Sequence, residues 1–192
     1  MMVSDEEEGR AMSEDDTRPG AAVGTAIRGR RQDDMDRCVA LLADVYAADG
    51  YPARWPADPH TWLAPEDLLG AWVAEDADGL AGHVVLWPAN GDSAAPVWSA
   101  ASDLPADRLA AVSRLFVAPR ARGRGLGARL LAAAHAEANA RRLHAALTVV
   151  DHDRGALALY ERAGWRRVAS IPASWALANG EHPLLHYYLA PG

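Results

Sequence analysis

The chain has 192 residues, a formal net charge of -7 and a hydrophobic fraction of 50%. This size and composition suit one domain with a sizeable hydrophobic core. No run of about 18 apolar residues occurs, so we expect no transmembrane helix, and the negative charge argues against a general nucleic-acid binder.

The first 22 residues are predicted to form a disordered acidic tail. Seven of the first 20 residues are acidic and two are basic, which accounts for five of the seven net negative charges. The segment lacks apolar periodicity and the basic-then-apolar order of a signal peptide. We expect either a solvating leader or a partner-binding segment here, followed by a single domain over residues 23–192.

A lone cysteine, Cys38, excludes an internal disulfide bond. It lies beside Val39, Leu41 and Leu42, which favours buried packing over catalysis. Together with the acidic N-terminus, this predicts a cytoplasmic protein.

The N-terminal part of the domain is predicted to contain a strand at 25–28 and a helix. Asp33 or Asp34 can cap this helix, and Gly50 ends it. A loop rich in proline and aromatic residues and a short helix are expected next, at 51–60 and 65–69.

Two apolar runs around a glycine turn predict an antiparallel hairpin at 71–75 and 80–87. The stretch 88–105, in which Trp98 is the one aromatic residue, is predicted to be a loop. The remaining expected elements are a strand at 109–117, a helix to about 142, a strand at 143–150, a helix from Asp153 to Gly164, and strands at 165–171 and 184–189. This order predicts an α/β domain with a mixed sheet.

A glycine-rich loop, Arg122-Gly-Arg-Gly-Leu-Gly127, separates the strand at 109–117 from the long helix. Glycines let backbone amides approach a ligand closely, and the start of a helix carries partial positive charge. We therefore predict a phosphate cradle here, with positive charge added by Arg120, Arg122, Arg124 and Arg129.

Two other phosphate-binding loops fit this sequence less well. A dinucleotide fingerprint would follow the first strand of its domain, and a P-loop would require a lysine, which the chain lacks entirely. A nucleic-acid contact through Arg120, Arg122 and Arg124 stays open as an alternative.

A second pattern follows about 30 residues later. It runs from Asp153 through Ala156 and Tyr160 to Gly164 and Trp165. The glycine loop resembles the Arg/Gln-x-x-Gly-x-Gly/Ala motif of the GNAT acetyltransferase superfamily, and this segment resembles its Asn-x-x-Ala-x-x-x-Tyr-x-x-x-Gly-Phe motif. Asp153 replaces the usual Asn and Trp165 the usual Phe. Because an ionised carboxylate only accepts hydrogen bonds, Asp153 cannot supply an amide donor.

The resemblance implies a GNAT fold, which is an α/β (α+β) domain. Its mixed, mostly antiparallel sheet has six to seven strands and is flanked by about four helices. It also implies an enzyme that moves the acetyl group of acetyl-CoA directly to a primary amine, with no covalent enzyme intermediate. We expect a small-molecule acceptor. A protein lysine or N-terminal acceptor, and a catalytically silent acyl-CoA-binding module, remain alternatives.

The family motifs also assign site residues. Tyr160 is expected to protonate the departing sulfur as general acid, although its apolar helix would equally suit a core tyrosine. The backbone of 115–117 is expected to bind pantetheine, with the Val117 amide polarising the acetyl carbonyl. The full expected set of acetyl-CoA-binding residues is Leu115, Phe116, Val117, Arg122, Gly123, Arg124, Gly125, Leu126, Gly127, Ala128, Asp153 and Ala156.

The general base is not identified by the motifs. Glu75, His83, Asp151 and His152 are candidates, and a route through ordered water is open. The histidine and cysteine spacings match no metal-binding motif, so we expect no metal.

The acceptor site is expected to lie near 51–69 and 88–105, with residues 172–183, which include Trp175, as a further border. Trp55, Trp62, Trp87 and Trp98 fall in or beside the first two stretches. Tryptophans in a pocket wall suit an apolar or cationic acceptor, whereas the same residues could instead fill the ends of the core. No nucleic-acid or membrane partner is expected, and a monomer and a homodimer fit equally.

Overall fold

The computed structural model describes residues 24–176 and 180–192, so the predicted acidic tail (1–22) lies outside the described residues. The strands are β1 (Ala26–Gly29), β2 (Gly70–Asp76), β3 (Gly79–Pro88), β4 (Leu109–Val117), β5 (His144–Val150), β6 (Arg166–Pro172) and β7 (Leu184–Leu189). The α-helices are α1 (Met35–Asp49), α2 (Pro59–Leu63), α3 (Ala95–Ser102), α4 (Leu126–Ala140) and α5 (Arg154–Arg162). Short 3-10 turns lie at Gln32–Asp34, Ala106–Arg108 and Pro119–Ala121.

The described strands form one seven-stranded sheet in the order β1-β2-β3-β4-β5-β7-β6. Every neighbouring pair is antiparallel except β4 and β5, which are parallel and are connected through α4. These two strands pair only from Leu109 with His144 to Ala111 with Ala146, although both continue beyond that point. The sheet therefore divides between β4 and β5. This confirms the predicted mixed, mostly antiparallel GNAT fold.

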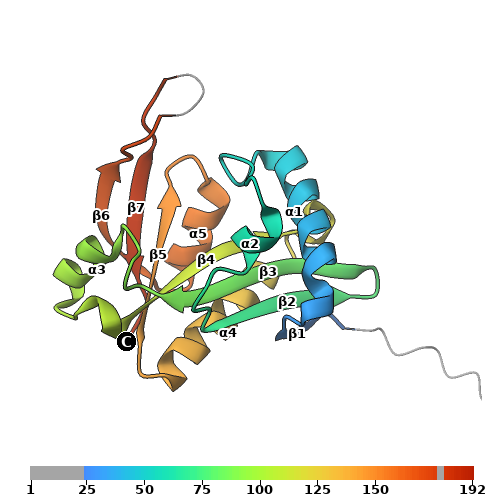
Figure 1. Ribbon diagram of the computed structural model, residues 1–192, viewed down its shortest axis with the longest axis horizontal. Helices are drawn as coiled ribbons and strands as arrows, with labels where there is room; N and C mark the ends of the chain where they lie inside the picture. The colour runs from blue at the N-terminus through green and yellow to red at the C-terminus, as the bar shows by residue number, and fades with distance from the viewer. Residues whose placement is uncertain (1–23, 177–179) are drawn as a thin grey trace, which may run out of the picture.

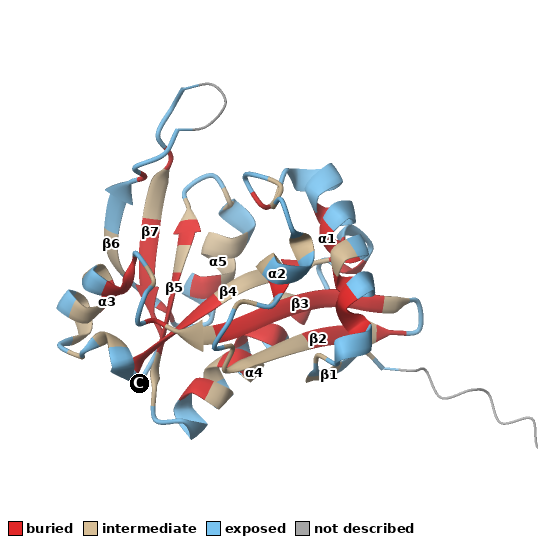
Figure 2. Cartoon of the chain, in the orientation of Figure 1, coloured by how far each residue is buried: buried red, intermediate tan, exposed pale blue. Residues whose placement is uncertain are grey.

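Helices cover both faces of the sheet (Figure 1). α1 and α2 lie on one face, and α1 contacts β3 and β4. α4 lies on the opposite face, where it contacts β2 to β5 and buries Leu130, Leu131 and Ala134. The central strands between these layers are buried, whereas β6 and the outer side of α1 are largely exposed (Figure 2).

Two of the predicted loops contain helices. α2 lies partly in the expected loop 51–60 and α3 lies in the expected loop 88–105, while the short helix predicted at 65–69 is not formed. Proline argues against a helix interior, but Pro59 and Pro96 occupy first turns, where no backbone donor is lost. The other predicted elements are confirmed to within two residues.

β4 has a bulge opposite Val84 of β3. His83 pairs with Phe116 and Val85 with Ser113, so that Arg114 and Leu115 together oppose one residue. Arg114 adopts a φ of 52°, in the left-handed region. A bulge bends its strand and increases the local twist, and this one lies where β4 has separated from β5.

The side chain of His83 stabilises the bulge from the protein core. It is fully buried and stacks on Phe116 with 5.1 Å between ring centroids. Nη1 of Arg30 lies 2.9 Å from His83 Nε2, so this nitrogen accepts a hydrogen bond, and Nδ1 donates to the Arg114 carbonyl oxygen at 3.1 Å. Burial lowers the pKa of His83 to about 3, which keeps the ring neutral.

A buried carboxylate ties the start of α1 to the sheet edge. Asp34 is fully buried, and it accepts hydrogen bonds from Arg28 at 2.6 and 3.0 Å, from Arg37, and from the Arg31 backbone at 2.7 Å. These contacts, chiefly the one from Arg28, hold the pKa of Asp34 well below its usual range. Glu75 of β2 completes the network by binding both Arg28 and Arg37.

We expect Asp34→Asn to lower the free energy of unfolding by about 3 kcal/mol, because it leaves Arg28 without its buried counter-charge. Urea denaturation measures this. Asp36→Asn is the matched control, since Asp36 is 94% exposed and bonds His60, and it should change stability by less than about 0.5 kcal/mol. Equal effects of the two substitutions would contradict a special role for Asp34.

We expect the free energy of unfolding to fall by about 2 kcal/mol from pH 7 to pH 5 through His83 alone. The unfolded ring takes up a proton below about pH 6.5, whereas the folded ring, with its lowered pKa, does not. Stability is therefore lost as the pH falls through this window. His83→Gln removes the titration, so its pH dependence should be flatter than that of the wild type by this amount. Parallel curves for the two proteins would refute the assignment.

Candidate active site

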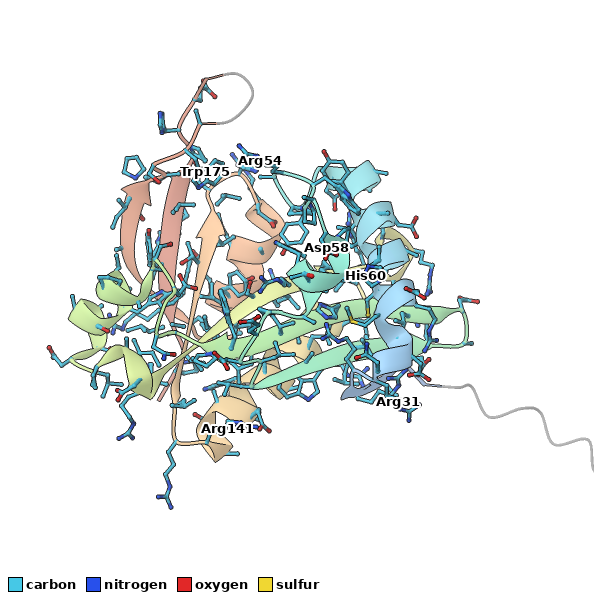
Figure 3. All side chains as sticks on the ribbon, in the orientation of Figure 1. Arg31, Arg54, Asp58, His60, Arg141 and Trp175 are labelled. Carbon is cyan, nitrogen blue, oxygen red and sulfur yellow. The ribbon has the colours of Figure 1, made fainter. Side chains whose placement is uncertain are left out.

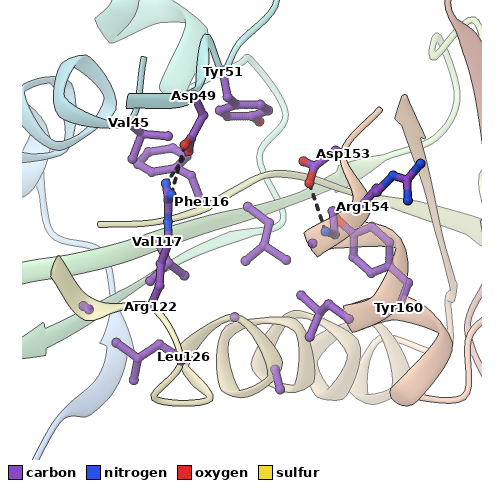
Figure 4. A pocket seen from close by; sticks show the side chains of 18 of the residues that line it. Val45, Asp49, Tyr51, Phe116, Val117, Arg122, Leu126, Asp153, Arg154 and Tyr160 are labelled. Atoms are coloured by element: carbon purple, nitrogen blue, oxygen red, sulfur yellow. Dashed lines mark hydrogen bonds and ion pairs between the residues drawn. The ribbon is translucent and has the colours of Figure 1, made fainter. Parts of the chain in front are cut away.

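A cavity of about 880 Å³ lies where β4 and β5 separate (Figure 4). Its walls are the ends of β4 and β5, the first turn of α4, helix α5 and the C-terminal end of α1. Every predicted acetyl-CoA-binding residue except Arg124 lines this cavity, as does Tyr160. The tertiary structure thus brings together two motifs that are about 30 residues apart in the sequence.

The glycine loop exposes the start of α4 to the cavity. Gly123 and Gly125 have φ values of 74° and 73°, a conformation that side chains disfavour. Gly125 is the N-cap of α4, and within the described residues no side chain caps this helix. Leu126, Gly127 and Ala128 of the first turn line the cavity. Their backbone donors, left without helix partners, form a site for an anion.

The arginines around the loop have separate roles. Arg120 binds Asp76 at 2.9 Å, and Arg124 binds the same carboxylate at 3.0 Å. Arg129 donates to the Thr25 backbone at 2.8 Å. Among the four arginines that the sequence placed around the cradle, Arg122 is the one that lines the cavity. Arg120 and Arg124 instead anchor the loop to the end of β2.

α5 brings further positive charge that sequence reasoning missed. Arg154 and Arg162 line the cavity from its first and last turns. Across the cavity, Arg122 forms a two-pronged ion pair with Asp49 at the end of α1 (Figure 4). Asp49 and Tyr51 also line the cavity. No motif marks either residue, because the fold alone places α1 against this loop.

Tyr160 lies deep in the cavity wall. It is 7% exposed and packs against Tyr188 and Trp165, with ring centroids 5.8 and 6.3 Å away. Burial raises the pKa of its phenol, so the hydroxyl keeps its proton. Asp153 caps α5 by accepting a hydrogen bond from the Ala156 backbone at 3.0 Å, as expected of a carboxylate.

Three of the four candidate bases lie outside the cavity. Glu75 is held by Arg28 and Arg37, and His83 is enclosed beneath the bulge with both ring nitrogens bonded. Asp151 does not line the cavity, whereas His152 does, from an exposed position. The two carboxylates that line the cavity, Asp49 and Asp153, are already engaged.

The four tryptophans have different surroundings. Trp98 is buried in α3, and Trp55 packs against Tyr46 with ring centroids 5.2 Å apart. Trp62 and Trp87 instead lie against the guanidinium of Arg114, whose Cζ is 4.8 and 5.2 Å from their ring centroids. The cation that these rings accommodate is therefore part of the chain.

Trp175, which follows β6, lies at the same end of the molecule as Arg54 of the α1–α2 loop (Figure 3). The Trp175 residue is 39% exposed. Residues 177–179 of the predicted acceptor border lie outside the described residues. In the described part of the chain, no cluster of side chains suits a metal ion, and no helix is both long and apolar enough to cross a membrane.

Solved structures of acetyltransferases share this fold. One is provisionally named a phosphinothricin N-acetyltransferase, with a TM-score of 0.65, 21% identity, and coverage of 87% of this chain and 98% of that chain. The ribosomal-protein-S18-alanine N-acetyltransferase of Escherichia coli has a TM-score of 0.64, 16% identity, and coverage of 88% and 96%. NAA60 of Arabidopsis thaliana in complex with acetyl-CoA has a TM-score of 0.67, 19% identity, and coverage of 86% and 97%.

The family comparison agrees with the structural one. Residues 33–165 match the model described as the Acetyltransferase (GNAT) family. A search of curated proteins returned no match. The matched region runs from the start of α1 to Trp165, and so contains both motifs and the cavity between them. The chain belongs to the GNAT acetyltransferase family, and is an acyltransferase whose co-substrate is acetyl-CoA.

Proposed function

We propose that this protein is an N-acetyltransferase that transfers the acetyl group of acetyl-CoA directly to the primary amine of a small molecule. One observation carries the proposal: the cavity has in one wall a helix start that no described side chain caps, and in another wall a buried tyrosine. The first feature suits a pyrophosphate group, and the second suits the protonation of a leaving thiolate.

The residues of the cavity fit acetyl-CoA. Its volume of about 880 Å³ matches the range for cofactor sites. In our proposal the amides of Gly123 to Ala128 hold the pyrophosphate, and Arg122 adds charge to them. The end of β4, from Leu115 to Val117, binds the pantetheine arm through its backbone. Asp153 and Ala156 form the facing wall from α5.

Acetyl-CoA supplies an activated acetyl thioester, and the chain's own groups act on it. The Val117 amide polarises the acetyl carbonyl, and the Tyr160 hydroxyl donates its proton to the departing sulfur. In our proposal the amine nitrogen forms its bond to the acetyl carbon as the carbon–sulfur bond breaks. The proton of the amine leaves through water, because Asp49 and Asp153 are engaged and the remaining candidate base of the cavity, His152, lies at its exposed rim.

The proposal takes the acceptor to be a small molecule rather than a protein. Structures of similar fold include a provisional phosphinothricin enzyme and one acting on a ribosomal protein, so fold alone does not choose between small-molecule and protein acceptors. We favour a small molecule because helices cover both faces of the sheet around the cavity (Figure 1), which leaves less room for a folded protein acceptor. Turnover of small amines, with none of peptides, would support this choice.

We expect Tyr160→Phe to lower kcat roughly 10- to 1,000-fold with little change in the affinity for acetyl-CoA. The substitution keeps the aromatic ring that lines the cavity and removes the hydroxyl proton that the thiolate needs. Steady-state kinetics with thiol detection measures this. Tyr188→Phe is the matched control, since its hydroxyl bonds Glu161 and does not line the cavity. Unchanged turnover in Tyr160→Phe would remove the tyrosine from the mechanism.

We expect Arg122→Gln to raise the KM for acetyl-CoA roughly fivefold, as for a partly exposed charge contact. Arg124→Gln should leave this KM within about twofold, because the Arg124 side chain binds Asp76 and Thr25 outside the cavity. The effect of Arg122→Gln should shrink as salt is added. If Arg124→Gln had the larger effect, the assignment of the two side chains would be reversed.

A further inference from the structure

The guanidinium of Arg114 lies on the face of the sheet opposite α4 and forms no ion pair within the described residues. Its Nε and Nη1 atoms are buried and have no hydrogen-bond partner within the described residues. No carboxylate among those residues lies within ion-pair distance of it. Other arginines near the sheet are engaged: Arg28 with Asp34 and Glu75, Arg120 with Asp76, and Arg30 with the Leu63 carbonyl at 2.7 Å.

The side chain is nevertheless held in one orientation. Trp62 of α2 and Trp87 of β3 lie against it, with Cζ at 4.8 and 5.2 Å from the ring centroids. Because the indole rings lie against the face of the guanidinium, its free N–H donors point outward in the plane of the group. A planar guanidinium edge matches a carboxylate in charge and in geometry.

The surroundings make an isolated cation costly at this position. Burial is the main cause that lowers the pKa of Arg114, and Arg30 lowers it further, whereas Tyr51 and Asp92 act in the opposite direction. Leaving a charged donor buried without a partner costs free energy. Arg114 as a whole is partly exposed, and its Nη2 atom is not among the buried donors, so an anion can approach the guanidinium from the Nη2 side and supply the missing partner.

The site adjoins the proposed reaction centre. Arg114 directly precedes Leu115, which lines the acetyl-CoA cavity. Tyr51 lies between the two regions: it lines the cavity, packs edge-on against Trp62 with ring centroids 6.3 Å apart, and is close enough to both Arg114 and Tyr160 to affect their pKa values. A group bound at Arg114 is therefore a near neighbour of the acetyl group.

We propose that Arg114, clamped between Trp62 and Trp87, binds a carboxylate of the acceptor, so that the acceptor is an amino-acid-like molecule carrying both an amine and a carboxylate. This inference rests on the proposed acetyl transfer and narrows its substrate class. It replaces the expectation of a cationic acceptor, because Arg114 already occupies the aromatic faces that would have bound one.

The test is a matched acceptor panel. Free amino acids, including lysine and ornithine, are compared with their C-terminal amides and with simple alkylamines by kcat/KM at fixed acetyl-CoA. The best free acid should exceed its amide roughly 10- to 150-fold, the range for a hydrogen bond to a charged group. In Arg114→Gln this ratio should fall close to one, with the loss mainly in the KM of the acid.

Two further variants distinguish a carboxylate site at Arg114 from a general effect of losing a positive charge. Arg114→Lys keeps the charge but loses the planar edge, so it should show an intermediate ratio, and it replaces Arg114→Gln if that variant fails to fold. Arg141→Gln is the control, since it removes a cation that already binds Glu137 and the Leu69 carbonyl and has no contact with His83 or Arg114 among the described residues, so it should affect acid and amide alike. Thermal melting and CoA binding check that each variant is folded.

The outcomes separate this inference from the function on which it rests. Turnover of amines with equal rates for acids and amides, or a ratio that persists in Arg114→Gln, would overturn the carboxylate site and leave acetyl transfer intact. No acetyl-CoA consumption with any acid, amide or alkylamine would overturn both.

Discussion

The hydrogen bond from His83 to the carbonyl oxygen of Arg114 is the contact on which the site depends most. A bulge removes a residue from the ladder and leaves its backbone groups without strand partners. Here the buried imidazole supplies the missing donor, and Arg30 fixes which nitrogen carries the proton. Because the bulge is stabilised from within the core, β4 can turn away from β5, and the cavity lies between the two strands.

The same strand then serves two purposes. Beyond the bulge, its backbone from Leu115 to Val117 borders the cofactor cavity. At the bulge, the left-handed conformation of Arg114 sends its side chain toward α2, between two tryptophans. In our proposal, one short stretch of β4 therefore places a thioester on one side and an acceptor carboxylate on the other, which would set their relative position without any large movement.

Charge around the cavity is divided between anchoring and binding. Asp76 takes up Arg120 and Arg124, so these side chains hold the loop in place and leave its amides free to face the cavity. Arg122, Arg154 and Arg162 remain at the cavity. Asp34 does not line the cavity, and its buried contacts with Arg28 and Arg37 stabilise the sheet edge at β1 and β2.

The sequence alone determined the strands, the long helices and the two motifs, because apolar periodicity, glycine positions and helix caps act locally. It could not show that Pro59 and Pro96 start helices rather than prevent them, since only the tertiary packing of α2 and α3 selects those turns. It could not assign each arginine a role either, because Arg120, Arg122 and Arg124 look equivalent in the sequence until distant residues, Asp76 and Asp49, are brought beside them. Arg114 shows this most clearly: its tryptophan neighbours are 52 and 27 positions away in the chain. Only the folded sheet brings all three together and leaves the buried donors of the cation without a partner among the described residues.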